Sequence, residues 1–400
     1  MKISSDFLIV GAGIVGLTVA KELLSRYPKS SISILEKEND IGKHASGRNS
    51  GVMHSGVYYG STTLKAKVCS LGAARMRDFA AEHGIACQRV GKVIIATSAD
   101  ELETLERLLV NAQNNGVNAE RLDEEGIRQI EPAASPYEAG IYCPDTAVID
   151  SNAVIQKLRS LLLQSGVKFY YGSLINSVSP CEKLVVTRNG QFTYGFLYNC
   201  AGAGADIVAK KFGFASDYTL VPFKGIYYKL KSHRKHLVKG NIYPVPDIEL
   251  PFLGVHLTRV ISGDVYVGPT AIPALGRENY GILKGIKLAE GFSIGRNLLT
   301  MYKENKENFR KLVHEEMKKY YKPSFVVAAR KLCNQIQVDD LESCDKVGIR
   351  PQLINTKKRT LEMDYIVEKG SDTLHVLNSI SPAFTSSLAF NEWIVDQAGH

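Results

Sequence analysis

Short apolar runs separated by an amphipathic stretch dominate the start of the chain. Residues Phe7–Val10 are all apolar and are followed by a glycine, which is typical of a buried parallel strand. Helical periodicity then runs from Ile14 to Ser25, with apolar positions available to face a sheet. A second short run, Ser31–Glu36, predicts another strand. This order predicts the strand–turn–helix–strand unit that opens a doubly wound α/β domain.

The turn in this unit reads GAGIVG and has the spacing G-x-G-x-x-G. Gly11 permits the tight turn, Gly13 lets the backbone approach a pyrophosphate, and Gly16 lets the helix pack closely on the strand. The free N–H groups at a helix start, together with the helix dipole, bind phosphate. We therefore expect a dinucleotide here, with Ile14 and Val15 at the start of the helix among its contacts.

The second predicted strand ends in an acid, Glu36, 20 positions after Gly16. A carboxylate at this place accepts both hydroxyls of an adenosine ribose and disfavours a 2′-phosphate. NADP is therefore disfavoured, while FAD and NAD both remain. The adjacent Lys37 is a further candidate for contact with the dinucleotide.

A loop rich in glycine and serine, residues 41–52, follows the ribose acid. FAD lies extended in its proteins, so its ribityl chain and ring must be threaded past backbone N–H groups, whereas NAD-binding folds rarely need such a loop. The loop therefore favours FAD. Its candidate contacts are Ser46, Asn49, Ser50 and Gly51.

Two later segments continue this pattern, and with them the chain resembles the D-amino-acid-oxidase-like superfamily of FAD oxidoreductases. The stretch 196–206 is similar to the closing strand of that superfamily, which places Ala201 and Gly202 beside the glycine turn. The tail is strand, loop and helix, and Thr385 or Ser386 would cap the helix. In the superfamily this helix start faces the pyrimidine edge of the flavin, where its positive end stabilises the reduced ring.

The resemblance implies a Rossmann-like FAD-binding domain interleaved with an α+β substrate domain on a mainly antiparallel sheet. We expect the FAD-binding domain at 1–85, 145–214 and 348–400, and the substrate domain at 86–144 and 215–347.

Further elements are expected from periodicity and from turn residues. Helices are predicted over Ala99–Asn114 and Ser151–Ser165, and a densely charged one over about 297–321. The strands predicted for the substrate domain lie at Arg89–Ala96, Gly225–Leu230, Thr258–Val267 with a turn at 262–264, and Leu361–Val367.

Finer matches resemble one family, the L-2-hydroxyglutarate dehydrogenases/oxidases. The matching segments lie at 49–59, 64–69, 238–247, 251–258, 267–271 and 348–352. The most specific string is Lys239–Asp247, since no general feature of the fold requires it. Members of the family bind FAD and oxidise the C2 hydroxyl of (S)-2-hydroxyglutarate to 2-oxoglutarate, passing electrons to a quinone or to oxygen. The resemblance implies the same activity here.

This reaction needs a base, because a hydride leaves C2 for flavin N5 while the hydroxyl proton leaves separately. A pKa near neutrality favours histidine. His54 lies in the loop expected beside the flavin, and His256 lies in the predicted strand Leu253–Leu257. We expect one imidazole to act as the base and the other as a hydrogen-bond donor, and the sequence leaves their order open.

Both substrate carboxylates need cations or hydrogen-bond donors. Arg350 is the first choice for the C1 carboxylate and is also a candidate for contact with the cofactor. Lys224 and Arg48 are candidates for the distal carboxylate, and Tyr58 and Tyr59 for donating hydrogen bonds.

Composition narrows the partners. The formal net charge of +8 suits an anionic ligand or a membrane surface. The seven cysteines show no metal-like spacing, so no metal site is expected. The start does not resemble a signal peptide, and the apolar run Phe7–Ala20 is too short to span a bilayer. We expect a cytoplasmic protein with any membrane contact peripheral, on the inner face.

Two other functions stay open at this point. One keeps FAD but oxidises an amino acid or an N-methyl amino acid, as other members of the superfamily do. The other is a non-enzymatic flavin-binding module with a basic partner surface, whose best stretch is Tyr227–Lys231. We expect no nucleic-acid partner.

Overall fold

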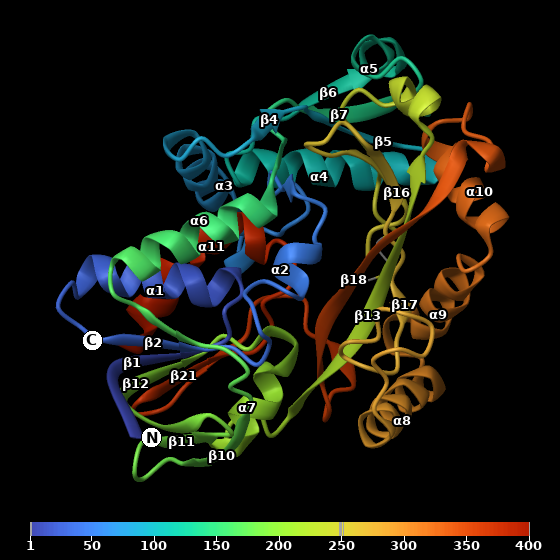
Figure 1. The fold of residues 1–400 in the computed structure, drawn as a ribbon. Coiled ribbons are helices and arrows are strands. Elements are labelled where there is room, and N and C mark those ends of the chain that lie inside the picture. The colour runs from blue at the N-terminus through green and yellow to red at the C-terminus, as the bar shows by residue number, and fades with distance from the viewer. Residues whose placement is uncertain (1, 248–249, 251, 400) are drawn as a thin grey trace.

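A mixed sheet with a parallel centre forms the part of the fold that carries the glycine turn (Figure 1). The computed structural model describes residues 2–247, 250 and 252–399, so Pro251 of the matching segment 251–258 lies outside the described residues. At the centre, β1 (Lys2–Val10) pairs in parallel with β12 (Gly190–Asn199) and β2 (Ile32–Leu35). The other strands are β9 (Lys168–Tyr170), β10 (Ile175–Ser179), β11 (Leu184–Thr187), β20 (Val367–Lys369) and β21 (Thr373–Val376).

Helices from both ends of the chain cover one face of this sheet. The C-terminal helix α11 (Ala383–Ala398) packs against α1 (Ile14–Arg26) and α3 (Leu64–Glu82), and α6 (Ser151–Gln164) packs on α1. Their buried apolar residues form one core with β1 and β2, including Ile9, Leu17 and Phe390. On the other face, Val208 of α7 (Ala205–Lys211) joins a smaller core with Leu8 and Phe192. Both faces are covered, as the apolar strand pattern predicts.

A larger and mainly antiparallel sheet forms the other half of the molecule. Its order is β19-β18-β13-β16-β15-β14-β5-β7-β6, with β17 paired to β13 and one parallel pair, β14 with β5. The strands are β5 (Lys92–Ile95), β6 (Glu120–Asp123), β7 (Ala139–Cys143), β13 (Tyr218–Leu230), β14 (Asn241–Pro244), β15 (His256–Arg259), β16 (Val265–Gly268), β17 (Ile272–Pro273), β18 (Leu341–Asn355) and β19 (Thr360–Leu361).

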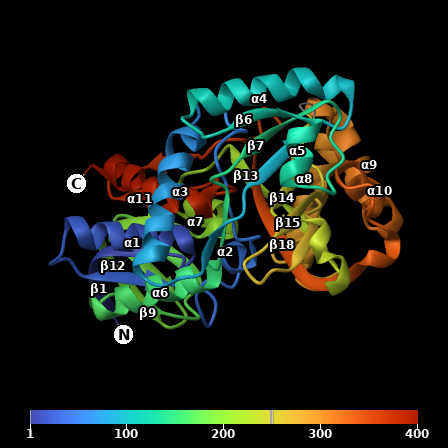
Figure 2. The same cartoon turned by 90° about the horizontal axis from the view of Figure 1, so that it is seen from above.

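The remaining helices lie on and around this larger sheet. They are α4 (Leu102–Asn114), α5 (Glu124–Ile130), α8 (Leu288–Glu304), α9 (Phe309–Lys318) and α10 (Lys322–Leu332). In both Figure 1 and Figure 2, α8, α9 and α10 lie on the side of the sheet that is turned away from α1 and α11. A third, small sheet consists of β3 (Val52–Met53), β8 (Ala147–Ile149) and β4 (Cys87–Arg89), in that order. The short helix α2 (Ala45–Arg48) forms within the predicted loop 41–52.

The predicted fold class, a parallel-sheet domain interleaved with a mainly antiparallel one, is confirmed by these sheets. The domain limits themselves stay a prediction. The limit between 347 and 348 falls inside β18, which runs without interruption along the edge of β13.

Three predicted elements are wrong in their extent, each for a local reason. The charged helix over 297–321 is broken, because Asn305 and Asn308 are left-handed and separate α8 from α9. The strand Arg89–Ala96 divides at Gly91, whose φ is +71°. The strand Leu361–Val367 is interrupted between β19 and β20, because the Asp364 carboxylate in its middle accepts the first amides of α3, those of Leu64 and Lys65.

Candidate active site

A cavity of about 640 Å³ runs between the two large sheets. One end is lined by the glycine turn and Glu36, and we call it the nucleotide end. The other end is lined by His54, His256 and Arg350, and we call it the catalytic end. Pockets of this size hold small ligands and cofactors in other proteins, where a few polar groups orient the ligand.

The glycine turn has the geometry that a pyrophosphate requires. Gly11 has a φ of +105°, and a Cβ there would lie 2.5 Å from the Cys200 carbonyl oxygen. A Cβ on Gly16 would overlap the Gly11 carbonyl oxygen, so only glycine lets α1 approach the turn this closely. The first helical amide, that of Ile14, donates to Ser46 Oγ at 2.9 Å. The turn and the loop at 41–52 therefore form one wall of the cavity.

Glu36 lies at the end of β2 and is held by backbone amides. Its Oε2 accepts from the Ala12 amide at 2.8 Å, and its Oε1 accepts from the Glu38 amide at 2.9 Å. Each carboxylate oxygen keeps a further lone pair, so the group can still accept two ribose hydroxyls. The residues at this end therefore fit the adenosine and pyrophosphate of FAD.

The segment Arg277–Tyr280 lies between β17 and α8 and lines the cavity, and we call it the strap. Arg277 forms a buried ion pair with Asp206, where Nη2 donates to Oδ2 at 2.8 Å, and it also donates to the Ala203 carbonyl. On the opposite wall, Glu278 pairs with Lys37 and the Tyr280 hydroxyl lies 2.8 Å from His44 Nδ1. The strap is thus tied to both walls.

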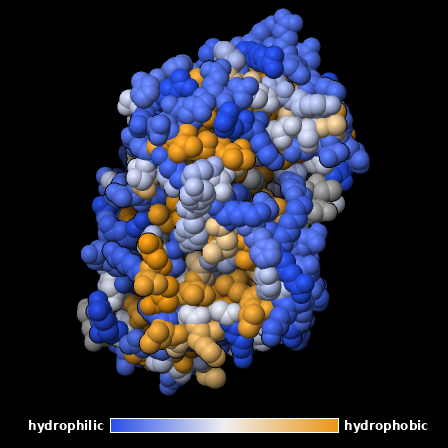
Figure 3. Space-filling model, turned by 90° about the vertical axis from the view of Figure 1, so that its right-hand side faces the viewer, coloured by the Kyte–Doolittle hydropathy of each residue, from blue (hydrophilic) through white to orange (hydrophobic). Residues whose placement is uncertain are grey.

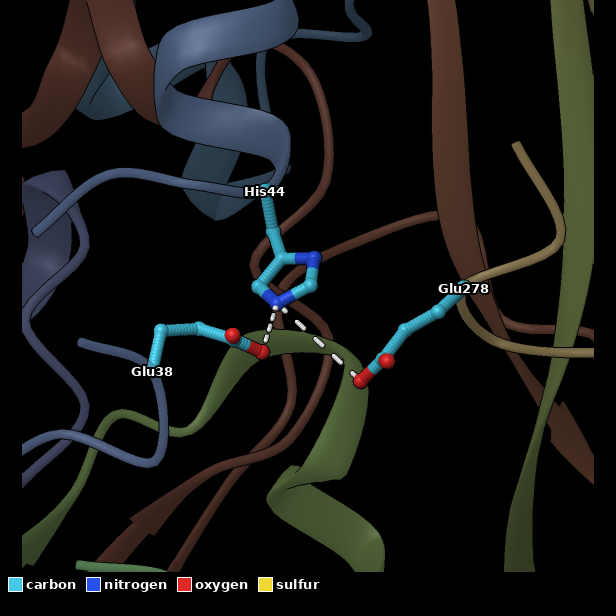
Figure 4. Close-up of side chains that lie close together, drawn as sticks. All are labelled: Glu38, His44 and Glu278. Atoms are coloured by element: carbon cyan, nitrogen blue, oxygen red, sulfur yellow. Dashed lines mark hydrogen bonds and ion pairs between the residues drawn. The ribbon is translucent and has the colours of Figure 1, made fainter. Parts of the chain in front are cut away.

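Figure 4 shows Glu38, His44 and Glu278 of the strap pointing toward one another, an arrangement that resembles a metal site. His44 Nε2 lies 2.9 Å from Glu38 Oε1 and 4.0 Å from Glu278 Oε1. The ammonium of Lys37 already contacts both carboxylates, at 2.9 Å from Glu38. We therefore interpret the cluster as an ion-pair network.

At the catalytic end, His256 has a defined tautomer. Its Nδ1 lies 2.9 Å from the Gly254 carbonyl oxygen, which can only accept, so Nδ1 carries the proton and Nε2 keeps its lone pair. The ring stacks on Tyr243, with centroids 4.0 Å apart. Burial lowers the pKa of His256 to about 4, so the imidazole is neutral near pH 7 and can accept a proton at Nε2.

His54 reaches the same end from the loop after β3. Its amide donates to Thr385 Oγ1 at 3.2 Å, and its Nε2 lies 3.3 Å from Ser381 Oγ. Burial, followed by the nearby charge of Lys92, lowers the pKa of His54 to about 3. Both imidazoles are therefore neutral near pH 7, but burial places their pKa values below the near-neutral value predicted for the base.

Arg350 provides a buried positive charge without an acidic partner among the described residues. It lies on β18 directly opposite Phe223 of β13, and its Cζ lies 4.7 Å from the Phe252 ring centroid. Its Nε donates to Gln352 Oε1 at 3.1 Å, and burial lowers its pKa to about 10. Tyr59 lies nearby with a hydrogen bond to Ser381, and burial raises its pKa.

Lys92 is a residue that the sequence analysis missed. It is only 1% exposed, its Nζ lies 3.3 Å from Ser55 Oγ, and its ammonium stands over the rings of Tyr58 and Tyr243 at 4.8 and 5.5 Å. Its charge lowers the pKa of both His54 and His256. The only sign in the sequence was a lysine at the start of the otherwise apolar strand KVII. Lysine is almost never fully buried without a partner, so this position did not stand out as a buried one.

Most of the predicted contact residues line this one cavity. They are Gly11, Gly13, Ile14, Val15, Glu36, Lys37, Ser46, Asn49, Ser50, His54, Ala201, Gly202, His256, Arg350 and Thr385. Arg48 also lines it, with its guanidinium 4.1 Å from the Tyr280 ring centroid. Gly16 and Gly51 lie behind the lining, where a Cβ would strike backbone atoms.

Two predictions about these residues are wrong. The side chain of Lys224 turns away from the cavity and donates to the Gly281 carbonyl at 2.6 Å, because strand alternation places Phe223 and Gly225 on the cavity face. Thr385 and Ser386 do not cap α11, which begins after Pro382. Ser386 Oγ is instead buried 2.9 Å from the Tyr365 hydroxyl.

Comparison with known proteins agrees with this site. The family described as FAD dependent oxidoreductase matches residues 6–397. The chain belongs to this family. This protein is therefore an FAD-dependent oxidoreductase, and its glycine turn and cavity fit FAD. Membership of this family favours an enzyme over the non-enzymatic module. Among the described residues of this oxidoreductase, no helix combines the length and apolarity needed to cross a bilayer.

Curated relatives narrow the family further. The oxidoreductase is 35% identical to L-2-hydroxyglutarate dehydrogenase of Indibacter alkaliphilus, over 98% of both chains. It is 34% identical to the human mitochondrial L-2-hydroxyglutarate dehydrogenase, over 98% of this chain and 88% of the relative. The Escherichia coli K12 L-2-hydroxyglutarate dehydrogenase is 31% identical, over 98% and 92%. The resemblance to the L-2-hydroxyglutarate dehydrogenases is therefore confirmed.

Solved structures confirm the fold. The L-alpha-glycerophosphate oxidase of Mycoplasma pneumoniae, solved with FAD bound, has a TM-score of 0.80 at 22% identity, over 99% of this chain and 95% of that one. The glycine oxidase of Geobacillus kaustophilus has a TM-score of 0.72 at 16% identity, over 99% and 94%.

Proposed function

We propose that this flavoprotein oxidises the C2 hydroxyl of (S)-2-hydroxyglutarate to 2-oxoglutarate. The observation that carries the proposal is a cation in the cavity, Arg350, that has no acidic partner among the described residues and lies beside two neutral imidazoles. Lys92 also lacks an acidic partner among them, and burial lowers its pKa. Buried charges of this kind are costly unless a ligand neutralises them, and a dicarboxylate brings two negative charges. The names of the curated relatives support the same substrate.

The residues at the catalytic end divide the work of the reaction. FAD, when bound, supplies an acceptor for the hydride that leaves C2. Nε2 of His256 accepts the hydroxyl proton, since its tautomer leaves that nitrogen unprotonated. Arg350 binds the C1 carboxylate, and His54 and Tyr59 orient the substrate through hydrogen bonds. Burial keeps both imidazoles deprotonated, and Lys92 beside them lowers their pKa further.

At the nucleotide end, the protein holds the cofactor through its backbone. The turn at Gly11 and Gly13 and the start of α1 receive the pyrophosphate, and Glu36 receives the ribose. Electrons then pass to a quinone or to oxygen. The flavoprotein works in the cytoplasm, with peripheral contact to the inner face of the membrane, which its net charge of +8 supports.

Anaerobic titration of the holoenzyme tests the proposal, because substrate oxidation bleaches the flavin. We expect (S)-2-hydroxyglutarate to bleach it and the R enantiomer to leave it yellow. (S)-2-hydroxybutyrate, which lacks the distal carboxylate, should bleach it at least tenfold less effectively. L-glutamate carries the same two carboxylates but has an amino group in place of the C2 hydroxyl. If glutamate bleaches the flavin and hydroxyglutarate does not, the amino-acid oxidase alternative is correct.

A further inference from the structure

The four large apolar side chains with the highest exposure among the described residues lie within eleven consecutive positions. They are Ile282, Leu283, Leu288 and Phe292, which are 88%, 78%, 91% and 79% exposed. Single exposed leucines are common on protein surfaces, but a cluster of this exposure marks an interaction site. Figure 3 shows apolar side chains gathered in the lower half of the face that carries α8.

The sequence of α8 explains how these side chains share one face. Leu288, Phe292 and Leu299 are spaced four and seven residues apart, so at 100° per residue they point within about 40° of one another. The opposite side of the helix carries Ile294 and Met301, which are buried in a core with Phe223. α8 is therefore apolar on both sides, and only one side has a partner within the described residues.

Basic residues stand between the exposed apolar ones. Lys284 and Lys287 are exposed, as is Arg296. Of the acidic residues of this region, Glu304 pairs with Arg359, and Glu278 and Glu290 line the cavity together with Lys287. Lys284 and Arg296 have no acidic partner among the described residues. The surface thus combines protruding apolar groups with unneutralised positive charge, which is the composition of an interfacial amphipathic element.

This surface also borders the cavity. Lys287 and Glu290 line the cavity, and Leu288 lies between them in the sequence with its side chain almost fully exposed. The strap immediately precedes Ile282 along the chain. Whatever binds to the surface therefore lies next to an opening of the site.

We propose that the α8 surface, made of Ile282, Leu283, Leu288 and Phe292 with Lys284 and Lys287, docks on an anionic lipid bilayer. The apolar side chains enter the acyl boundary, while the lysine ammonium groups stay at the level of the lipid phosphates. The inference deepens the proposed function, from which it takes only the need to reach a membrane-dissolved acceptor. It adds the surface and the orientation of the site.

A second copy of this chain fits the surface less well than a bilayer. In a two-fold dimer the same patch meets itself, so the lysines of both copies would be brought into one interface. Like charges across an interface cost several kcal/mol in general. Anionic lipid neutralises the same lysines, which is the charge complementarity that favours it.

Co-sedimentation with vesicles tests the proposal on the holoenzyme. We expect the protein to bind phosphatidylcholine vesicles that contain about 30% phosphatidylglycerol, a proportion that gives roughly the surface charge of a natural membrane. Binding to pure phosphatidylcholine vesicles should be at least about tenfold weaker. The double substitution Leu288→Ser with Phe292→Ser should reduce binding to the anionic vesicles at least tenfold. Lys284→Glu with Lys287→Glu should do the same.

A matched control keeps exposure and residue class but changes the location. Val110 and Leu174 are 53% and 59% exposed on other elements, and Val110→Ser with Leu174→Ser should bind vesicles as the wild type does. Equal binding by the control and the α8 variants overturns the proposal. The proposal is also overturned if the wild-type protein does not bind vesicles but forms a dimer, and the α8 substitutions dissociate that dimer.

The test is independent of the substrate. Flavin bleaching by (S)-2-hydroxyglutarate in vesicle-free solution should be unchanged in the Leu288→Ser and Phe292→Ser double variant, because both side chains are almost fully exposed and neither lines the cavity. If bleaching fails in the wild type while vesicle binding persists, the proposed substrate is wrong and the docking surface stands.

Discussion

The two ends of the cavity balance their charges in opposite ways. At the nucleotide end Glu36 accepts two amides, Lys37 pairs with Glu38 and Glu278, and Arg277 pairs with Asp206. At the catalytic end Arg350 and Lys92 are buried without an acid among the described residues. The groups named at the nucleotide end thus have partners within the chain, while an anion can still pair with Arg350 at the catalytic end.

This difference indicates how each end recognises its ligand. A completed end holds its ligand mainly through backbone geometry and shape, which suits a cofactor that stays bound. An incomplete end binds strongly to the charge that completes it and releases a product whose charge or geometry differs. Substitutions should therefore act on cofactor retention at one end and on turnover at the other.

The largest effect is expected from His256→Gln. Removing a general base lowers the rate by about 10²–10⁴-fold, so flavin bleaching in anaerobic stopped flow should slow by this factor. His375→Gln is the matched control, because His375 is also buried with its pKa lowered to about 4, yet it bonds Asn199 and Thr373 away from the cavity. A similar slowing in both variants would show that the effect is structural.

Arg350→Met should come next. Removing the cation that completes a buried charge pair costs about 3–4 kcal/mol, which lowers kcat/KM for (S)-2-hydroxyglutarate about 10²–10³-fold. Lys224→Met removes a cation that lies one residue from the cavity face, and it should leave kcat/KM within about threefold of wild type. If Lys224→Met causes the greater loss, the assignment of the carboxylate site is wrong.

Gly16→Ala tests the nucleotide end. The added methyl group meets the Gly11 carbonyl oxygen, and overpacking of about 1–3 kcal/mol should weaken FAD binding about tenfold or more. Ultrafiltration of the yellow protein, with absorbance of the filtrate, measures the loss. Gly60→Ala is the control, since a Cβ there meets nothing within 4 Å. Retention of FAD by both variants would contradict the close packing at the turn.

The smallest effect concerns Lys65, which is buried near Arg350. Burial lowers its pKa from the ordinary 10.5 to about 7, so between these values the unfolded chain binds more protons than the folded one. Wild-type stability should therefore rise relative to Lys65→Met as the pH increases from 7 to 10.5. We expect the difference in Tm to change by about 1–3 °C across this window. A difference that is flat with pH would show that Lys65 keeps its proton in the folded protein across this window, so that burial does not lower its pKa.

Local sequence was sufficient for the nucleotide end. The apolar strand, the glycine spacing and the terminal acid lie within 36 residues, so their relation in space follows from the strand–turn–helix unit itself. The resemblance to a family supplied His54 and His256, which lie far apart in the chain and on different elements. No pattern within a window of ordinary length could have brought these two imidazoles together.

Strand parity accounts for the errors at the catalytic end. Lys224 and its neighbour Phe223 differ by one position, and the register of β13 against β18 places Phe223 opposite Arg350. The sequence shows the strand but not which of its faces meets the cavity. Lys92 was missed for a related reason, because a lysine at a strand start usually points to solvent, and only the packing of β5 between β14 and β7 buries it.

The position of the last helix has a consequence for how the protein is made. α11 fills the space between α1 and α3, and Asn391 Nδ2 donates to the Thr18 carbonyl at 2.9 Å, while β21 pairs with β12. The first strand and helix therefore leave the ribosome long before their packing partners exist. A nascent chain carries the phosphate-binding turn from the outset but can enclose nothing with it until synthesis is almost finished.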